Sequence, residues 1–307
     1  MRVFVTGASG HIASAVIPEL LSNGHQVTGL ARSDAAAEAI AGLGADVRRG
    51  DLDDLDGLRQ AASEADGVIH LAFKHESMLT GDYMGAVESD LAATRALGDA
   101  LVATDRPFVT TGGTLMLAMA GITGPGGRVG TEDDQSAAGP RVDAANYTLG
   151  LAEQGVRSSV VRLAPMVHSD LDHGGFTHAL IEFARQNGAA AYVGDGSNRW
   201  PAANTYDIGV LYRLALEKAP AGCTFHGVGD LGIPRKLIAE TIAGKLGIES
   251  KSITDEEAPQ YLGFLAGFAT LDNPVSNDKT REVLGWAPTH PGWIEDVEHG
   301  HYFAAVA

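Results

Sequence analysis

The stretch TGASGHIA, residues 6–13, is the first part of the chain whose residue types and spacing could do chemistry. It places glycine at Gly7 and Gly10 and alanine at Ala13, between a β-rich run and apolar residues at helical spacing. In such a strand–turn–helix the first glycine permits a tight turn, and the second lets backbone approach a pyrophosphate at the helix N-terminus. A plain glycine turn between core elements is the alternative, but the flanking elements favour dinucleotide binding.

The end of the second expected strand, GLARSD, bears on which dinucleotide binds. The position that usually offers a carboxylate to the ribose 2′-hydroxyl carries Arg32 or Ser33. A guanidinium can pair bidentately with a 2′-phosphate, which a carboxylate would repel. We therefore expect NADP(H), and Asp34 keeps NAD(H) as the alternative because a shift of one or two residues would restore an acid.

Other histidine, aspartate and cysteine residues are expected to be solvated or structural and not to bind a metal or react. The run HSDLDH (168–173) and the pair His299 and His301 contain metal-ligand types, but loops of this composition are usually solvated. Hydride transfer from a nicotinamide needs no metal, so none is expected. Cys223, the single cysteine, lies in an apolar run and is expected in the core.

Composition limits the partners of the chain. The 307 residues are 45% hydrophobic and 20% charged, which is typical of a globular protein. A formal charge of −17 without a basic stripe argues against nucleic acid and anionic membrane. No apolar run approaches the ~20 residues of a membrane span. One cysteine and no signal-peptide pattern predict a cytoplasmic protein.

Strand and helix patterns alternate through the first half of the chain. Strands are expected at 2–6, 25–32, 45–52, 66–72, 106–111 and 157–164, with helical stretches between them. After Pro165 the rhythm changes to polar, glycine-bearing loops, with helices at about 176–186 and 234–246 and a strand at 223–228. This order predicts an α/β fold: a Rossmann-type, doubly wound parallel sheet over 1–165, with a smaller substrate lobe over 166–307 interleaved with the last sheet elements.

With these elements placed, the chain resembles the extended or atypical short-chain dehydrogenase/reductase superfamily, near the sugar-nucleotide epimerases and dihydroflavonol reductases. The resemblance runs from Val3 to about Tyr302. It rests on the ordered motifs TGASGHIA, GDLDD, VIHLAF, FVTTGGT, VVRLAPMVHS, YVGDGSNRWPAANTYDIG and LGWAP.

The resemblance implies a set of site residues. Around the cofactor it implies Thr6, Gly7, Ser9, Gly10, His11 and Ile12 at the pyrophosphate, Asp51 and Leu52 at the adenine, Leu71 and Ala72 at its ribose, and Pro165 and Val167 at the nicotinamide. Thr111 or Thr114 falls where the family keeps a hydroxyl near the substrate carbonyl.

The chain departs from the family at the catalytic pair. Members that transfer hydride by the usual route carry Tyr-x-x-x-Lys before the sixth strand, and none of the seven tyrosines here has a lysine four residues on. Counting back from GVRSSVVRL puts Ala137 near the tyrosine position and Arg141 near the lysine position. Arg141 could still grip ribose hydroxyls, but it cannot act as an acid or base at neutral pH.

Two residues are candidates for the missing acid. Tyr147 is the nearest phenol, on the expected helix 142–152, and His168 follows the nicotinamide segment with an imidazole that titrates near neutrality. Helix packing and a structural histidine are the plainer alternatives. An apolar substrate pocket is expected from Met166, Phe176, Trp200 and Tyr206, although each could simply pack the core.

These observations predict an NADP(H)-dependent oxidoreductase that reduces the carbonyl, or an imine, of a small apolar or aromatic substrate. The alternative is a non-catalytic NADP(H) sensor, which the missing pair favours. A sugar-nucleotide epimerase is a third interpretation, and it would need the same missing tyrosine. A homodimer is left open.

Overall fold

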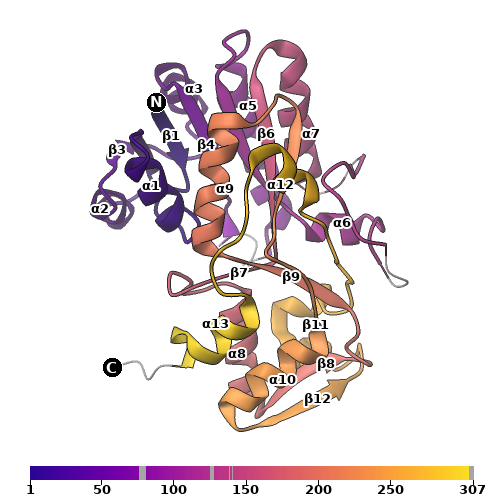
Figure 1. Cartoon of the computed structure of the whole chain (residues 1–307). Helices are drawn as coiled ribbons and strands as arrows, with labels where there is room; N and C mark the ends of the chain where they lie inside the picture. The colour runs from indigo at the N-terminus through magenta and orange to yellow at the C-terminus, as the bar shows by residue number, and fades with distance from the viewer. Residues whose placement is uncertain (76–80, 125–127, 138, 140, 304–307) are drawn as a thin grey trace.

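The computed structural model describes residues 1–75, 81–124, 128–137, 139 and 141–303 (Figure 1). Its main feature is a seven-stranded sheet of order β10-β6-β5-β4-β1-β2-β3, in which the paired neighbours are parallel. The strands are β1 (Arg2–Thr6), β2 (Gln26–Ala31), β3 (Asp46–Arg49), β4 (Gly67–His70), β5 (Pro107–Gly113), β6 (Arg157–Leu163) and β10 (Cys223–Gly227). The predicted Rossmann-type sheet is therefore confirmed, with β3 shorter than expected.

Helices cover both faces of this sheet (Figure 1). One face carries α1 (Ala13–Ser22), α2 (Asp34–Gly42), α9 (Thr205–Lys218) and α12 (Asp278–Leu284), and the other carries α3 (Leu55–Glu64), α5 (Tyr83–Asp99) and α7 (Val142–Gly150). Helices α1 and α9 pack closely because Gly209 has no side chain: a Cβ there would lie 2.9 Å from the carbonyl oxygen of Ala15. A short helix, α6 (Leu115–Met119), follows β5.

The smaller lobe lies beyond the carboxyl ends of the strands (Figure 1). It holds a sheet of β7 (Met166–His168), β9 (Arg199–Asn204) and β11 (Asp230–Pro234) and a pair of β8 (Ala189–Val193) and β12 (Glu249–Ile253). Its helices are α8 (Phe176–Asn187), α10 (Arg235–Leu246), α11 (Ala258–Leu262) and α13 (Trp293–His299). Apolar residues of these elements form a core of their own, separate from the two cores that flank the large sheet.

The chain passes between the two parts several times. After β9 it returns through α9 and β10 to the large sheet, and after α11 it returns again through α12. The Trp286 indole donates a hydrogen bond to the carbonyl oxygen of Asp207, 2.8 Å away, and thereby attaches the late segment to α9. Strand β7 links both parts, because Val167 packs in the core beneath the large sheet while Met166 packs in the lobe core.

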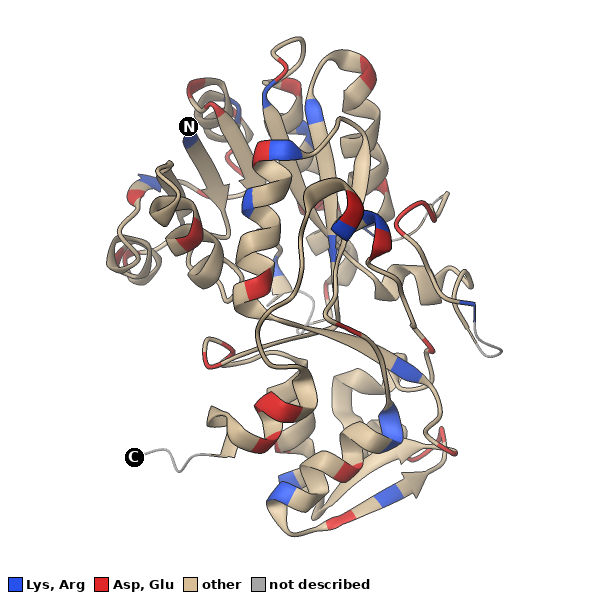
Figure 2. Ribbon diagram, viewed as in Figure 1, with Lys and Arg blue, Asp and Glu red and all other residues tan. Residues whose placement is uncertain are grey.

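Charged residues are interspersed along the elements (Figure 2). Within the described ranges, no helix combines the length and hydropathy that a bilayer crossing requires.

Candidate active site

The glycine loop between β1 and α1 has the geometry expected of a pyrophosphate cradle. Gly7 has a φ of +67°, and a Cβ at this residue would stand 2.7 Å from the backbone nitrogen of Ala72. Any other residue would therefore be strained and would clash with the chain leaving β4. The Gly10 amide donates to the carbonyl oxygen of Gly7 at 3.0 Å, which closes the turn before the first turn of α1. A Cβ at Gly10 would lie only 3.2 Å from that carbonyl oxygen, so both positions favour glycine, and a glycine turn before a helix N-terminus fits a phosphate group.

The end of β2 carries the groups that the sequence predicts at the adenosine ribose. Ser33 caps α2, because its Oγ accepts from the Ala36 amide at 3.2 Å. The Asp34 carboxylate forms an ion pair with Arg49, whose register partner at the end of β3 is Ala31. Asp34, the acid for which NAD(H) remained the alternative cofactor, is therefore neutralised by Arg49. Sequence reasoning named Arg32 but missed Arg49, although the RRG that ends the third strand was visible.

The adenine and ribose residues predicted from the resemblance lie at the same edge. Asp51 is exposed and its carboxylate accepts from the Asp53 amide at 3.0 Å, while Leu52 is buried against the core on the α3 side. Leu71 and Ala72 are half-buried and follow β4 directly. The Ala72 amide donates to Oγ1 of Thr6, 3.3 Å away.

A chain of buried polar groups runs from the glycine loop to α7. Oγ1 of Thr6 lies 2.6 Å from Nδ1 of His70, and Nε2 of His70 lies 3.3 Å from Oδ1 of Asp90 on α5. Oδ2 of Asp90 is in turn 3.9 Å from Nε of Arg141. Since a carboxylate only accepts, the His70 ring donates from Nε2 and accepts the Thr6 hydroxyl proton at Nδ1.

Arg141 occupies the place that the resemblance gives to the lysine. It is the N-cap residue before α7, with a φ of +62°, and its guanidinium stacks 4.0 Å above the ring of Phe73. Its Nε is buried and has no hydrogen-bond partner among the described residues. Residues other than glycine rarely adopt this left-handed backbone conformation, and buried donors rarely lack a hydrogen-bond partner. Both features are enriched at functional sites. Ala137, at the tyrosine position, precedes the helix.

The two threonines predicted as oxyanion donors are already engaged. Thr111 donates from Oγ1 to the carbonyl oxygen of His70 at 2.8 Å, so the Tyr212 hydroxyl, 2.7 Å away, must donate to the same Oγ1. Thr114 has no exposed surface, and its Oγ1 accepts from Nδ2 of Asn273 at 3.0 Å. The Thr111 hydroxyl would have to leave the His70 carbonyl oxygen before it could donate to a substrate. Thr114 accepts from Asn273 and so keeps its own proton, but it is fully buried.

Tyr147 lies on α7, away from the glycine loop. Its hydroxyl donates to Oδ1 of Asp99 at 2.5 Å, at the last residue of α5, and the ring packs against the core near the beginnings of β5 and β6. Burial, followed by the Asp99 contact, raises the pKa of Tyr147 well above its usual range. Burial of the ring and the hydrogen bond to Asp99 therefore indicate that Tyr147 packs its helix against the core in this geometry.

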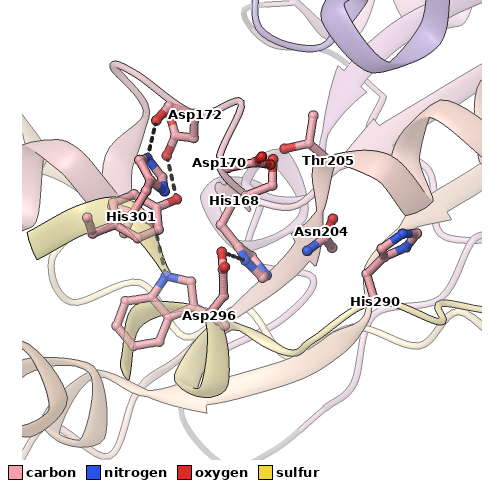
Figure 3. A network of polar contacts seen from close by, with 12 residues as sticks. His168, Asp170, Asp172, Asn204, Thr205, His290, Asp296 and His301 are labelled. Atoms are coloured by element: carbon pink, nitrogen blue, oxygen red, sulfur yellow. Dashed lines mark hydrogen bonds and ion pairs between the residues drawn. The ribbon is translucent and has the colours of Figure 1, made fainter. Parts of the chain in front are cut away.

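His168 is placed differently from the other candidates (Figure 3). It ends β7, is fully buried, and its Nδ1 lies 2.7 Å from Oδ2 of Asp296 on α13. Its Nε2 is buried and has no hydrogen-bond partner among the described residues. The ring is therefore held at one nitrogen and unengaged at the other, an arrangement suited to proton transfer. Asp296 was missed by sequence reasoning, because a contact across 128 positions leaves no local signal.

The loop after β7 brings this region to the glycine loop. Nε2 of His11 lies 2.8 Å from Oγ1 of Thr205, and Nδ1 of His11 lies 3.8 Å from Oδ1 of the buried Asp172. Burial lowers the pKa of His11, while the charge of Asp172 opposes the shift. In the described part of the chain, no group of three or more His, Cys, Asp or Glu residues is arranged to hold a metal ion.

The structure does not bring the four predicted pocket residues together. Met166 and Trp200 have no exposed surface and pack in the lobe core, and the ring of Phe176 lies 6.0 Å from that of Trp200. Tyr206 is exposed on α9, where its hydroxyl donates to Asp170 at 2.9 Å. Pro165 is half-buried between β6 and β7. The large apolar surfaces of Met166 and Trp200 stabilise the lobe instead of lining an open pocket.

Comparisons with known proteins agree with this geometry. Residues 7–112 match a family described as NAD(P)H-binding. An uncharacterized protein of Schizosaccharomyces pombe is 41% identical over 99% of this chain and 100% of its own. A 2-alkyl-3-oxoalkanoate reductase of Stenotrophomonas maltophilia is 28% identical over 74% of this chain and 68% of its own. The dTDP-glucose 4,6-dehydratase DesIV of Streptomyces venezuelae, solved with NAD and TYD, superposes with a TM-score of 0.74 at 19% identity, covering 97% of this chain and 96% of that one.

Proposed function

Since this chain belongs to the extended short-chain dehydrogenase/reductase superfamily, the NAD-dependent epimerases and dehydratases, and binds NAD(P)H, we propose that it reduces the carbonyl or imine of a small apolar or aromatic substrate with NADPH. The observation that carries the proposal is the pair formed by His168 and Asp296. The pair offers an imidazole nitrogen, Nε2, that has no hydrogen-bond partner among the described residues and lies in the strand that begins directly after Pro165. The reductase named among the relatives supports the same reaction class.

The cofactor would be held by groups at the carboxyl ends of β1, β2 and β4. The glycine loop would receive the pyrophosphate, and Arg32 with Arg49 would favour a 2′-phosphate. Arg141, whose Nε has no hydrogen-bond partner among the described residues, would bind the hydroxyls of the second ribose, the task that the family assigns to its lysine. When bound, the nicotinamide supplies the hydride.

The protein would supply the proton. Reduction of a carbonyl places the hydride on carbon and leaves charge on oxygen, which takes a proton from Nε2 of His168. Asp296 orients the ring and stabilises its protonated form, because its carboxylate faces Nδ1 at 2.7 Å. General acid help of this kind contributes about 10²–10⁴-fold to a rate. Asp296 is in this scheme a positioning residue.

The test is NADPH oxidation with a panel of aryl ketones, aldehydes and imines. His168→Gln should lower kcat at least tenfold while the dissociation constant for NADPH stays the same. Tyr147→Phe removes a hydroxyl that binds Asp99 and should leave kcat unchanged. Turnover that is as fast in His168→Gln as in the unmutated protein would remove His168 from the mechanism.

A non-catalytic NADP(H) sensor is the second candidate. The observation in its favour is that none of the seven tyrosines has a lysine four residues on, and counting along the sequence puts Ala137 and Arg141 near the family's Tyr and Lys positions. Tight NADPH binding without oxidation of the cofactor across the whole panel would establish the sensor and exclude the reductase.

A further inference from the structure

His11 lies between the glycine loop and the lobe. It follows Gly10 directly, and its Nε2 is hydrogen-bonded to Oγ1 of Thr205, the first residue of α9, at 2.8 Å. Its Nδ1 faces the loop after β7, where Oδ1 of Asp172 lies 3.8 Å away. This second distance is too long for a hydrogen bond, although it is short enough for an ion pair. The imidazole is therefore attached to α9 and only faces the lobe.

Asp172 is held firmly in the position that faces His11 (Figure 3). It has no exposed surface, and its Oδ1 accepts from the amides of Gly174 and Gly175 at 3.2 and 2.8 Å. Its Oδ2 accepts from the Tyr302 hydroxyl at 2.9 Å. Because both oxygens are held by these donors, the carboxylate can receive a charged imidazole with little movement of the lobe.

The imidazole is neutral at neutral pH in the protein without cofactor. Burial lowers the pKa of His11 from its usual 6.5, and the charge of Asp172 opposes this shift without cancelling it. Three further histidines face His11 and also lower its pKa: His173 in the loop after β7, His168 on β7 and His178 on α8. A proton on His11 is therefore disfavoured in the free protein, even though a carboxylate stands beside the ring.

The environment of this imidazole changes when a dinucleotide binds. The pyrophosphate brings negative charge to the loop that carries His11. Nearby negative charge favours the protonated form of an imidazole and raises its pKa. A protonated ring has no acceptor nitrogen, so Nε2 must then donate to Thr205 and Nδ1 is left as a donor toward Asp172.

We propose that His11 takes up a proton when NAD(P)H binds and then pairs with Asp172, which draws the loop 169–175 of the lobe onto the occupied cofactor site. His11 is in this scheme a positioning residue that couples cofactor binding to the placement of the lobe. The inference rests on cofactor binding and not on the proposed reduction, so it applies to a reductase and to a sensor alike.

The first measurement counts the proton. NADPH is titrated calorimetrically in buffers of different ionisation enthalpy, at several pH values between about 6 and 8. The unmutated protein should take up a fraction of a proton more than His11→Gln, whose amide can reach Thr205 but cannot be charged. The difference between the two proteins is compared because the 2′-phosphate itself titrates at about pH 6. Equal proton uptake in both proteins at every pH would overturn the proposal.

The same titrations give the dissociation constants. Because the complex binds more protons than the free protein, His11 strengthens cofactor binding most at low pH, and this gain is lost as the pH rises through the pKa of His11 in the complex. The Kd of His11→Gln divided by that of the unmutated protein should therefore fall as the pH rises, by up to about tenfold per pH unit. A ratio that is constant with pH would show that His11 only packs.

His173→Asn is the matched control for both measurements. His173 is an exposed histidine of the same loop, and its removal leaves His11 and Asp172 in place. The variant should keep the proton uptake and the pH dependence of the unmutated protein. Loss of both in His173→Asn, with both retained in His11→Gln, would assign the proton to His173 and refute the role of His11.

Hydrogen exchange tests the link to the lobe. The amides of Gly174 and Gly175 donate to Asp172, so NADPH should slow their exchange in the unmutated protein and slow it less in His11→Gln. Asp172→Asn should lose most of the extra proton uptake, and His11→Gln keeps the test decisive should Asp172→Asn not fold. Equal slowing in His11→Gln and the unmutated protein would show that the loop responds to the cofactor without His11.

Discussion

The carboxylate of Asp296 lies 2.7 Å from Nδ1 of His168 and joins the last long helix of the lobe to the strand that leaves the large sheet. The contact fixes the imidazole in one orientation and leaves Nε2 without a partner within the described residues. Because Asp296 sits on α13 and His168 on β7, the pair also joins two elements of the lobe that lie far apart in the sequence. Mutation of Asp296 can separate a role of the pair in proton transfer from a role in packing the lobe.

We expect Asp296→Asn to lower kcat about tenfold or more while the KM for NADPH is unchanged. The amide can still hydrogen-bond the ring, but it no longer stabilises a positive charge on it. Asp296→Glu should restore part of the rate, because the carboxylate is retained. The matched control is Glu298→Gln on the same helix, whose side chain is half exposed and ion-pairs with the exposed His299. Equal loss of rate and of cofactor binding in Asp296→Asn would indicate a structural role alone.

The ion pair between Asp34 and Arg49 leads to a prediction about cofactor choice. Arg49→Met should raise the dissociation constant for NADPH at least tenfold and shift the preference toward NADH. The substitution removes a cation and exposes the Asp34 carboxylate, which repels the 2′-phosphate. Arg32→Ala should also weaken NADPH binding. Binding by isothermal titration calorimetry measures both constants directly.

Arg48→Met is the control for this prediction, since Arg48 alternates to the other face of β3 and binds Glu64 at 2.8 Å. Adding Asp34→Asn to Arg49→Met should recover part of the lost affinity. Identical dissociation constants for NADH and NADPH in the unmutated protein would contradict the assignment of this edge to a 2′-phosphate.

Gly7 gives a prediction about the fold and the cofactor together. Gly7→Ala should destabilise the protein by roughly 2 kcal/mol or more, because it adds left-handed strain of about 1–2 kcal/mol and a Cβ contact at 2.7 Å from Ala72. NADPH binding should be lost in the folded fraction. Gly24→Ala separates the two effects: its φ is +80°, but open space surrounds its Cβ position. Urea unfolding should show a clearly smaller loss for Gly24→Ala.

The sequence was informative wherever the signal is local. The strand at 2–6, the glycine loop and the helix beginning near 176 follow from residue periodicity and turn chemistry, and the structure confirms them. Short lobe strands such as β7, of three residues, and β12, whose sequence is ESKSI, were missed, because neither has the β-rich apolar run that marks β1. A strand of that length is defined by its neighbours in space.

The site was predicted less completely than the fold, for the same physical reason. Arg49, Asp90 and Asp296 act through partners 15, 51 and 128 positions away, and nothing in their local sequence marks them. Trp200 was expected at a pocket because it is large and aromatic, but the same properties make it the centre of the lobe core. Burial decides between these outcomes, and burial is set by tertiary packing.

His226 gives a prediction about stability and pH. It is fully buried in β10, where its Nδ1 donates to the carbonyl oxygen of Ser276 at 2.8 Å and its Nε2 faces Nη1 of Arg162 at 3.4 Å. Burial, with a further contribution from the charge of Arg162, lowers the pKa of His226 to about 3. In the unfolded chain a histidine titrates near 6.5. Between these two values the unfolded chain binds more protons than the folded one, so stability rises with pH.

The contribution of His226 is therefore fully present above about pH 6.5 and is lost as the pH falls toward 3. From pH 7 to pH 5 the loss should be about 2 kcal/mol. His226→Asn should be less stable at pH 7, since it loses the contact with Arg162. Between pH 7 and pH 5, however, its free energy of unfolding should fall by about 2 kcal/mol less than that of the unmutated protein. The exposed His299→Asn should keep the unmutated slope, while His11 and His75, whose pKa values burial also lowers, add to the slope in every variant. Urea unfolding at each pH measures the difference, and parallel curves for His226→Asn and the unmutated protein would show that His226 does not titrate on unfolding.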